Sequence, residues 1–86
     1  YRSGAMKTFH LTVAKVGENL FEGEAISATL PGSEGVFQIL AEHEAFVSEL
    51  KQGEVSIRGA HGELHHFEVS QGGIAEVSRN QATILL

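Results

Sequence analysis

The sequence predicts a small all-β domain. Short runs of alternating apolar and polar residues, typical of half-buried strands, recur along its 86 residues. Turn residues, mostly glycines, separate these runs at intervals of about 8–12 residues, a spacing found in β-sandwiches and small barrels. No repeat, low-complexity stretch or linker interrupts this rhythm. The pattern therefore indicates one domain, either a β-sandwich or a small barrel.

The first strand is predicted from Lys7 onward by its alternation. Phe9, Leu11 and Val13 fall on one face of an extended chain, and polar residues fall on the other. Residues 16–19 have the composition of a turn. We therefore expect a half-buried strand that turns back sharply at its end.

The next two strands meet at a glycine-rich turn. Gly23 is expected to break the chain before a strand at 25–30, which runs into Pro-Gly-Ser-Glu-Gly at 31–35. A second apolar run follows at 36–40. We interpret this stretch as a β-corner, in which Gly35 adopts a backbone conformation that is costly for residues with a Cβ atom.

Five shorter strands complete the predicted fold after a polar loop at 41–45. The spacers at 51–54 and 60–63 both suit hairpins with glycine at a position of positive φ. The predicted strands lie at 46–50, 55–57, 64–69, 74–77 and 82–86.

Composition excludes several classes of protein. The chain has no cysteine, so zinc-thiolate sites and cysteine nucleophiles are excluded. Its net charge is −5, from eleven acidic and six basic residues, and the basic residues are scattered rather than clustered. Nucleic acid is therefore not an expected partner. The longest apolar runs are far shorter than the roughly 20 residues of a membrane-spanning helix.

Patterns that often carry chemistry are weak in this chain. His65 and His66 are adjacent in a predicted strand, so their side chains point to opposite faces and cannot share one metal ion. Residues 42–44, Glu-His-Glu, have no nearby nucleophile, and we interpret them as a polar loop. The glycine-rich stretch at 32–35 lacks the Lys-Ser/Thr ending of a phosphate loop. We expect no cofactor, metal or small-molecule substrate.

Six motifs, in order, resemble the epsilon subunit of the F-type ATP synthase. The resemblance spans nearly all of residues 7–86. Each motif is weak alone, but six in sequence over eighty residues are fairly specific. The motifs lie at 9–13, 20–23, 31–35, 50–53, 72–77 and 80–85.

The resemblance implies the amino-terminal domain of that subunit, a sandwich of two roughly five-stranded sheets. The family member is a non-catalytic rotor subunit that binds the gamma subunit, rests on the c-ring and couples proton flow to ATP synthesis. By this resemblance the chain is a monomer in isolation and touches the membrane only through the complex, at the cytoplasmic face of the bacterial inner membrane.

The resemblance also suggests where partners bind. His43 and Ser48 match family positions near the gamma and c-ring contacts, whereas residues 36–42 depart from the usual family pattern. Val36 and Phe37 place apolar side chains beside a turn, where burial within a monomer is hard to complete. The predicted partner-binding residues are Glu34, Val36, Phe37, Gln38, His43 and Ser48.

We interpret residues 1–6 as an expression remnant with the start methionine, and residues 7–86 as the epsilon-type domain. In the family a helical hairpin that regulates ATP hydrolysis follows the last strand. The apolar segment 82–86 fits a closing strand and leaves no residues for such a hairpin. The chain is therefore expected neither to bind ATP nor to inhibit hydrolysis. The alternative interpretation is a free-standing β-sandwich module that binds a protein or a carbohydrate.

Overall fold

The computed structural model describes residues 7–41 and 44–86, and this part of the chain consists of strands joined by turns and short loops. None of the described residues belongs to a helix that could cross a membrane. The strands are β1 (Phe9–Lys15), β2 (Glu18–Gly32), β3 (Gly35–Leu40), β4 (Phe46–Leu50), β5 (Gly53–Gly59), β6 (Leu64–Val69), β7 (Gly73–Ser78) and β8 (Gln81–Leu85).

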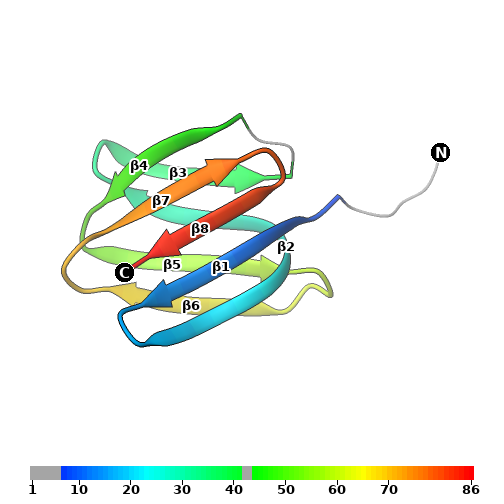
Figure 1. Ribbon diagram of the computed structural model, residues 1–86, viewed down its shortest axis with the longest axis horizontal. Helices are drawn as coiled ribbons and strands as arrows, with labels where there is room; N and C mark the ends of the chain where they lie inside the picture. The colour runs from blue at the N-terminus through cyan, green and yellow to red at the C-terminus, as the bar shows by residue number, and fades with distance from the viewer. Residues whose placement is uncertain (1–6, 42–43) are drawn as a thin grey trace.

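The strands form two layers that share the long strand β2 (Figure 1). The first part of β2 pairs with β1, and this layer continues through β8 and β7 to β4. The second part of β2 pairs with β3 on one side and β5 on the other, and β6 completes the second layer. The predicted all-β sandwich is confirmed, and its hydrogen-bonded network is continuous because β2 belongs to both layers.

A β-bulge lets β2 pass from one layer to the other. Ala25 pairs with Gly59 and Ser27 pairs with Arg58, so one extra residue, Ile26, is inserted in β2. The bulge shifts the phase of the buried positions: Ala25 is buried before it, and even-numbered residues such as Ala28 are buried after it. One strand can therefore supply side chains to the same core from both layers.

Two predictions about β2 and β3 were wrong. Gly23 does not break the chain, because it pairs with Leu11 in the ladder between β1 and β2 and the strand continues through it. The stretch at 31–35 is a hairpin and not a corner, because Pro31 pairs with Val36 and the two apolar runs lie side by side. Local glycine content predicts flexibility, but pairing with the neighbouring strand β1 carries β2 through Gly23 without a break.

The two spacers predicted as hairpins differ. Residues 60–63 join β5 to β6 in an antiparallel hairpin, with φ of +85° at Gly62, as predicted. Residues 51–54 do not form a hairpin, because β4 pairs with β7 whereas β5 pairs with β2 and β6. This connection crosses from one layer to the other because β4 and β5 pair with strands of different layers.

Within the part of the chain that the structure describes, fifteen buried apolar residues fill the space between the layers. Two aromatic contacts close the open sides of this space. Where β3 faces β4, the rings of Phe37 and Phe46 meet nearly edge to face, 5.4 Å apart with an angle of 72°. Where β6 faces the first part of β2, the rings of Phe21 and His65 lie 4.9 Å apart. We call the open side closed by Phe37 and Phe46 the β3–β4 side, which lies at the top of Figure 1. We call the open side closed by Phe21 and His65 the β2–β6 side.

Candidate partner-binding site

The hairpin that joins β2 to β3 is anchored to the end of β4. Gly32 pairs with Gly35, so only two residues form the turn between them. The backbone N–H of Ser33 donates to the carbonyl oxygen of Glu49 at 2.9 Å, and that of Lys51 donates to the carbonyl oxygen of Pro31 at 2.8 Å. These bonds satisfy backbone groups at the end of β2 and hold the hairpin against the other layer.

Glycine is required at both ends of this turn for different reasons. Gly35 has φ of +135°, which residues with a Cβ rarely adopt, although no atom lies within 4 Å of the place where its Cβ would be. A Cβ on Gly32 would lie 2.7 Å from the carbonyl oxygen of Gly35 and 2.8 Å from the ring of Phe37. The predicted strain at Gly35 is thus a backbone effect, whereas Gly32 makes room for an aromatic ring.

Three of the predicted partner-binding residues are exposed on the hairpin. Glu34 lies in the turn, and Val36 and Gln38 point outward from β3. Val36 is 70% exposed. Phe37 points the other way, is half-buried and contacts Phe46. An exposed valine beside a carboxylate suits contact with another protein, whereas Phe37 chiefly holds the two layers together.

Of the remaining two predicted residues, the structure describes only Ser48, which does not share this exposed surface. Ser48 lies in β4, on the strand face that also carries buried Leu50, and its hydroxyl donates to the carbonyl oxygen of Glu49 at 3.1 Å. His43 lies outside the described residues. The structure therefore brings Glu34, Val36 and Gln38 together and places Phe37 and Ser48 on inward-facing positions.

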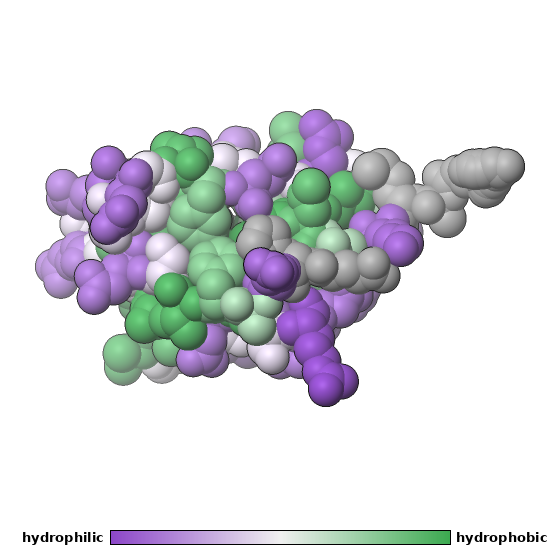
Figure 2. Space-filling model, turned by 90° about the horizontal axis from the view of Figure 1, so that it is seen from above, coloured by the Kyte–Doolittle hydropathy of each residue, from purple (hydrophilic) through white to green (hydrophobic). Residues whose placement is uncertain are grey.

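Two exposed aliphatic residues near this side were not predicted. Leu40 in β3 and Val47 in β4 are both at least half exposed. Figure 2, which looks down on the β3–β4 side, shows apolar surface interrupted by polar side chains. Sequence alone offered one signal, since each residue is apolar at a position where strand alternation calls for a polar one.

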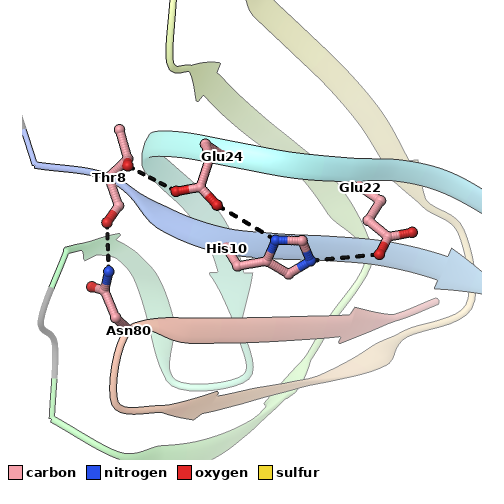
Figure 3. A network of polar contacts seen from close by, with 5 residues as sticks. All are labelled: Thr8, His10, Glu22, Glu24 and Asn80. Atoms are coloured by element: carbon pink, nitrogen blue, oxygen red, sulfur yellow. Dashed lines mark hydrogen bonds and ion pairs between the residues drawn. The ribbon is translucent and has the colours of Figure 1, made fainter.

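A network of polar side chains lies on the outer face of β1 and β2 (Figure 3). His10 lies between two carboxylates, with Nε2 3.5 Å from Glu22 and Nδ1 3.5 Å from Glu24. The Thr8 hydroxyl donates to Glu24 at 2.8 Å, and the Asn80 side chain donates to the Thr8 carbonyl oxygen at 2.6 Å. All of these groups are solvent-accessible, so the network pins β1 to its neighbours without contributing much stability.

The other histidines diverge as predicted. His65 packs against Phe21, whereas His66 points outward, with Nδ1 3.2 Å from the Ser56 hydroxyl and 3.5 Å from Glu54. Over residues 7–41 and 44–86, no three His, Asp or Glu side chains are arranged to hold a metal ion. The contacts of His66 are therefore surface pairs on the ladder between β5 and β6.

Glu63 organises the turn between β5 and β6. A hydrogen bond from its own backbone N–H lowers the pKa of this carboxyl below its ordinary value of 4.5. Desolvation opposes this effect, and a hydrogen bond from the backbone N–H of His61 lowers the pKa further. The bond from His61 is 3.0 Å long, and the nearby His61 and His65 also lower the pKa. The Glu63 carboxylate lies over Gly59, where a Cβ atom would collide with it.

Two surface hollows lie near the end of β6. The larger has a volume of about 860 Å³ and is lined by residues 52–54 and 66–70. The smaller, of about 450 Å³, is bordered by parts of β1, β2 and β6 and by the carboxyl-terminal Leu86. None of the predicted partner-binding residues that the structure describes lines either hollow.

Comparison with known sequences gives one consistent family. Residues 8–86 match the family model for the ATP synthase delta/epsilon chain β-sandwich domain. The chain is 38% identical over 80 residues to the ATP synthase epsilon chain of Delftia acidovorans, covering 93% of this chain and 57% of the relative. It is 36% identical over 81 residues to the epsilon chain of Caulobacter vibrioides, covering 93% of this chain and 91% of the relative.

Comparison with solved structures supports the fold. A chain of the Euglena gracilis mitochondrial ATP synthase superposes with a TM-score of 0.84 at 24% identity, covering 99% of this chain and 54% of the other. A chain of the Tetrahymena thermophila central stalk and c-ring superposes with a TM-score of 0.77 at 17% identity, covering 95% and 65%. The chain thus spans a little over half the length of several proteins that it matches.

Proposed function

Because the chain belongs to the family of ATP synthase delta/epsilon chain β-sandwich domains, we propose that it is a non-catalytic subunit of the rotor of an F-type ATP synthase. In this role it links the gamma subunit to the c-ring, so that proton flow through the membrane sector is coupled to ATP synthesis. Its place is the cytoplasmic face of a bacterial inner membrane, reached through the complex.

One observation carries the proposal: the family match covers residues 8–86, the whole of the described sandwich except Lys7. The Caulobacter vibrioides relative adds support, because this chain covers 91% of that epsilon chain. A relative of nearly the same extent is thus also an ATP synthase epsilon chain.

The fold suits a part that transmits force. Its fifteen buried apolar residues form one core, and β2 runs through both layers. Close-packed interiors have low compressibility and transmit strain. A load applied to the hairpin side can therefore pass through β2 to the opposite layer without a hinge between two separate sheets.

We propose that the exposed hairpin surface contacts the partners in the rotor. Glu34, Val36 and Gln38 form the accessible part of this surface. We include Ser48 and His43 among the contact residues because of their family positions alone. Phe37 supports the surface from below through its contact with Phe46. Exposed aliphatic groups beside a turn provide the apolar anchor that interfaces need.

The first experiment measures binding to the gamma subunit encoded by the same genome. We expect Val36→Ser to weaken binding about tenfold, in line with the loss of an interface anchor. Leu64→Ser is the matched control, because Leu64 is an exposed aliphatic residue at the start of β6 and should change binding less than twofold. Equal effects of the two substitutions would move the interface away from the hairpin.

The second experiment tests coupling itself. An ATP synthase depleted of its epsilon subunit is reconstituted with this chain, and ATP-driven proton pumping into vesicles is followed by fluorescence quenching. Restored pumping is the expected result. If the parent chain binds neither the gamma subunit nor the depleted complex, the proposed function is wrong, whatever the hairpin variants do.

A further inference from the structure

Strand β6 lies at the edge of its layer (Figure 1). Within the described part of the chain its only ladder is the one with β5, so one row of its backbone N–H and C=O groups has no strand beside it. The hollow of about 450 Å³ is lined by Phe67 and Glu68 of β6 together with Lys15 and Leu20 of β1 and β2. The structure therefore leaves open space between the end of β6 and the strands of the other layer.

The hydrogen bonds with β5 show which residues present their backbone groups to the free edge. The N–H of Gly59 donates to the carbonyl oxygen of Glu63 at 2.8 Å, so these two residues form a hydrogen-bonded pair. Hydrogen-bonded and non-hydrogen-bonded pairs alternate along an antiparallel ladder. The backbone groups that point away from β5 are therefore those of Leu64, His66 and Glu68.

The charges of β6 distinguish it from the other strands that have an unpaired edge. β3 has no charged residue, and β4 and the part of β2 before its bulge carry only carboxylates. None of these three edges offers a cation to the carboxylates of an identical strand. β6 carries both histidine and glutamate, and its exposed His66 and Glu68 lie on one strand face.

These side chains select one register for pairing β6 with an identical strand. If Phe67 lies opposite Phe67 of a second copy, each His66 lies opposite Glu68 of the other copy, on both sides of a two-fold axis. A shift by one step sets His66 opposite His66, and a shift the other way sets Glu68 opposite Glu68. Opposite charges across a ladder are stabilising and like charges are destabilising, so the register centred on Phe67 is favoured.

The side chains concerned are available for such contacts. The contacts of His66 with Ser56 and Glu54 both involve Nδ1, which leaves Nε2 for another partner. Glu68 makes no hydrogen bond or ion pair with another described residue. Phe67 is half-buried, and in the central pair, where side chains approach most closely, the rings of two copies can cover each other.

We propose that the isolated chain forms a two-fold symmetric dimer through β6, so that the partner at this edge is a second copy of the chain. The contact of one short strand from each copy is smaller than the roughly 1,200–2,000 Å² of stable complexes, so the dimer is weak and forms at high concentration. This inference replaces the expectation of a monomer in isolation. It does not depend on the rotor role.

The first test measures self-association of the purified chain by analytical ultracentrifugation. Between about 10 μM and 1 mM, we expect the average mass to rise from that of one chain toward that of two. His66→Glu and Glu68→Lys should each raise the dissociation constant of the dimer about tenfold, because like charges then lie opposite each other.

Combining the two substitutions provides the decisive control. The new carboxylate then lies opposite the new ammonium group, so the dissociation constant should return to within about threefold of the parent value. Glu76→Lys, on the other layer, should leave it unchanged, and circular dichroism checks that each variant is folded. A parent chain that stays monomeric at 1 mM, or a combined variant as weak as the single ones, would overturn the dimer.

The second test reads the register from disulfide formation, since the chain has no cysteine of its own. An equimolar mixture of His66→Cys and Glu68→Cys places two thiols opposite each other, within the reach of a disulfide, and keeps one pair of His66 and Glu68. Mild oxidation should link the mixture at least about fivefold more than either variant alone. Equal linking of His66→Cys alone would mean that His66 faces His66, and the proposed register would be wrong.

Binding to the gamma subunit, measured on the same preparations, separates this inference from the proposed function. A chain that binds gamma but stays monomeric at 1 mM overturns only the dimer. A chain that dimerises with the expected charge dependence but does not bind gamma supports the dimer and overturns only the rotor role.

Discussion

The two open sides of the sandwich are closed by the same kind of contact in different surroundings. On the β3–β4 side two phenylalanine rings meet, and exposed aliphatic residues flank them. On the β2–β6 side a phenylalanine meets an imidazole, and the adjoining turn carries Glu63 and His61. The first side therefore depends on apolar packing and suits coverage by a partner. The β2–β6 side carries polar groups that can stay in contact with water, and the stability of this side depends on pH through Glu63.

The largest difference is expected from removing one ring on each side. Phe37→Ala should lower the free energy of unfolding by about 2–3 kcal/mol, because a half-buried aromatic ring and its contact with Phe46 are lost. His65→Ala should cost about 1 kcal/mol, since imidazole is smaller and more polar. Urea unfolding of both variants measures the difference. Equal costs would contradict the contrast between the two sides.

The turns on the two sides should share one backbone requirement. Gly35→Val should cost about 1–3 kcal/mol, because φ of +135° is strained for valine although space is available. Gly62→Val, with φ of +85°, should behave similarly. Gly23→Val is the control, because Gly23 lies within β2 without positive φ. An unchanged urea midpoint for Gly35→Val would show that the hairpin relaxes without cost.

The free energy of the contact between Phe37 and Phe46 can be measured separately from the cost of losing either ring. A double-mutant cycle with Phe37→Leu and Phe46→Leu should give a coupling free energy of about 1 kcal/mol, as expected for a nearly edge-to-face pair. Leucine keeps most of the apolar volume, so the cycle reports the aromatic geometry. A coupling near zero would mean that this side is closed by burial alone.

The smallest effect is expected from Glu63, whose contribution to stability is present at neutral pH and is lost in acid. Its pKa is lower in the folded chain than the ordinary 4.5, so its stabilising effect is complete above pH 4.5 and is lost as the pH falls through the folded value. Glu63→Gln should therefore lower the melting temperature at pH 7 and have little effect at pH 3. Thermal unfolding followed by circular dichroism at both pH values provides the measurement.

Two control substitutions locate this pH dependence on the β2–β6 side. Gly59→Ala should reproduce the effect of Glu63→Gln, because the new Cβ displaces the carboxylate that lies over Gly59. Glu34→Gln, in the turn on the β3–β4 side, removes a carboxylate that does not contact Gly59 or Glu63 and should not reproduce this effect. If Gly59→Ala keeps the full acid-dependent loss, the hydrogen bonds of Glu63 do not cause it.

Local patterns in the sequence predicted much of the fold because they reflect backbone physics. Alternation identified β1, with Phe9, Leu11 and Val13 all buried. Glycine in a polar spacer identified the hairpin between β5 and β6, where Gly62 has positive φ. The order of six motifs also identified the family. Alternation and turn glycines depend on residues that are neighbours in the chain, and the motif order can be read along the sequence without knowing which strands pair.

The candidate site was only partly predictable. Val36 was expected to be exposed because it follows a turn, and it is. Phe37 was grouped with it, but alternation along β3 turns its ring inward to Phe46. Val47 was missed because an apolar residue in a predicted strand is ordinarily assigned to the core. Alternation puts Val47 on the strand face opposite that of Leu50, and the structure shows that Leu50 is the residue that faces the core.

The sequence by itself thus determined where strands and tight turns form, since alternation and glycine act over a few residues. The tertiary structure alone decided that Gly23 continues β2, that residues 51–54 cross between layers, and that Val47, Ile74, Leu85 and Ala14 become neighbours. These outcomes depend on which strands pair and in what register. That choice is made by contacts between residues far apart in the chain, where burial of the shared core outweighs local preference.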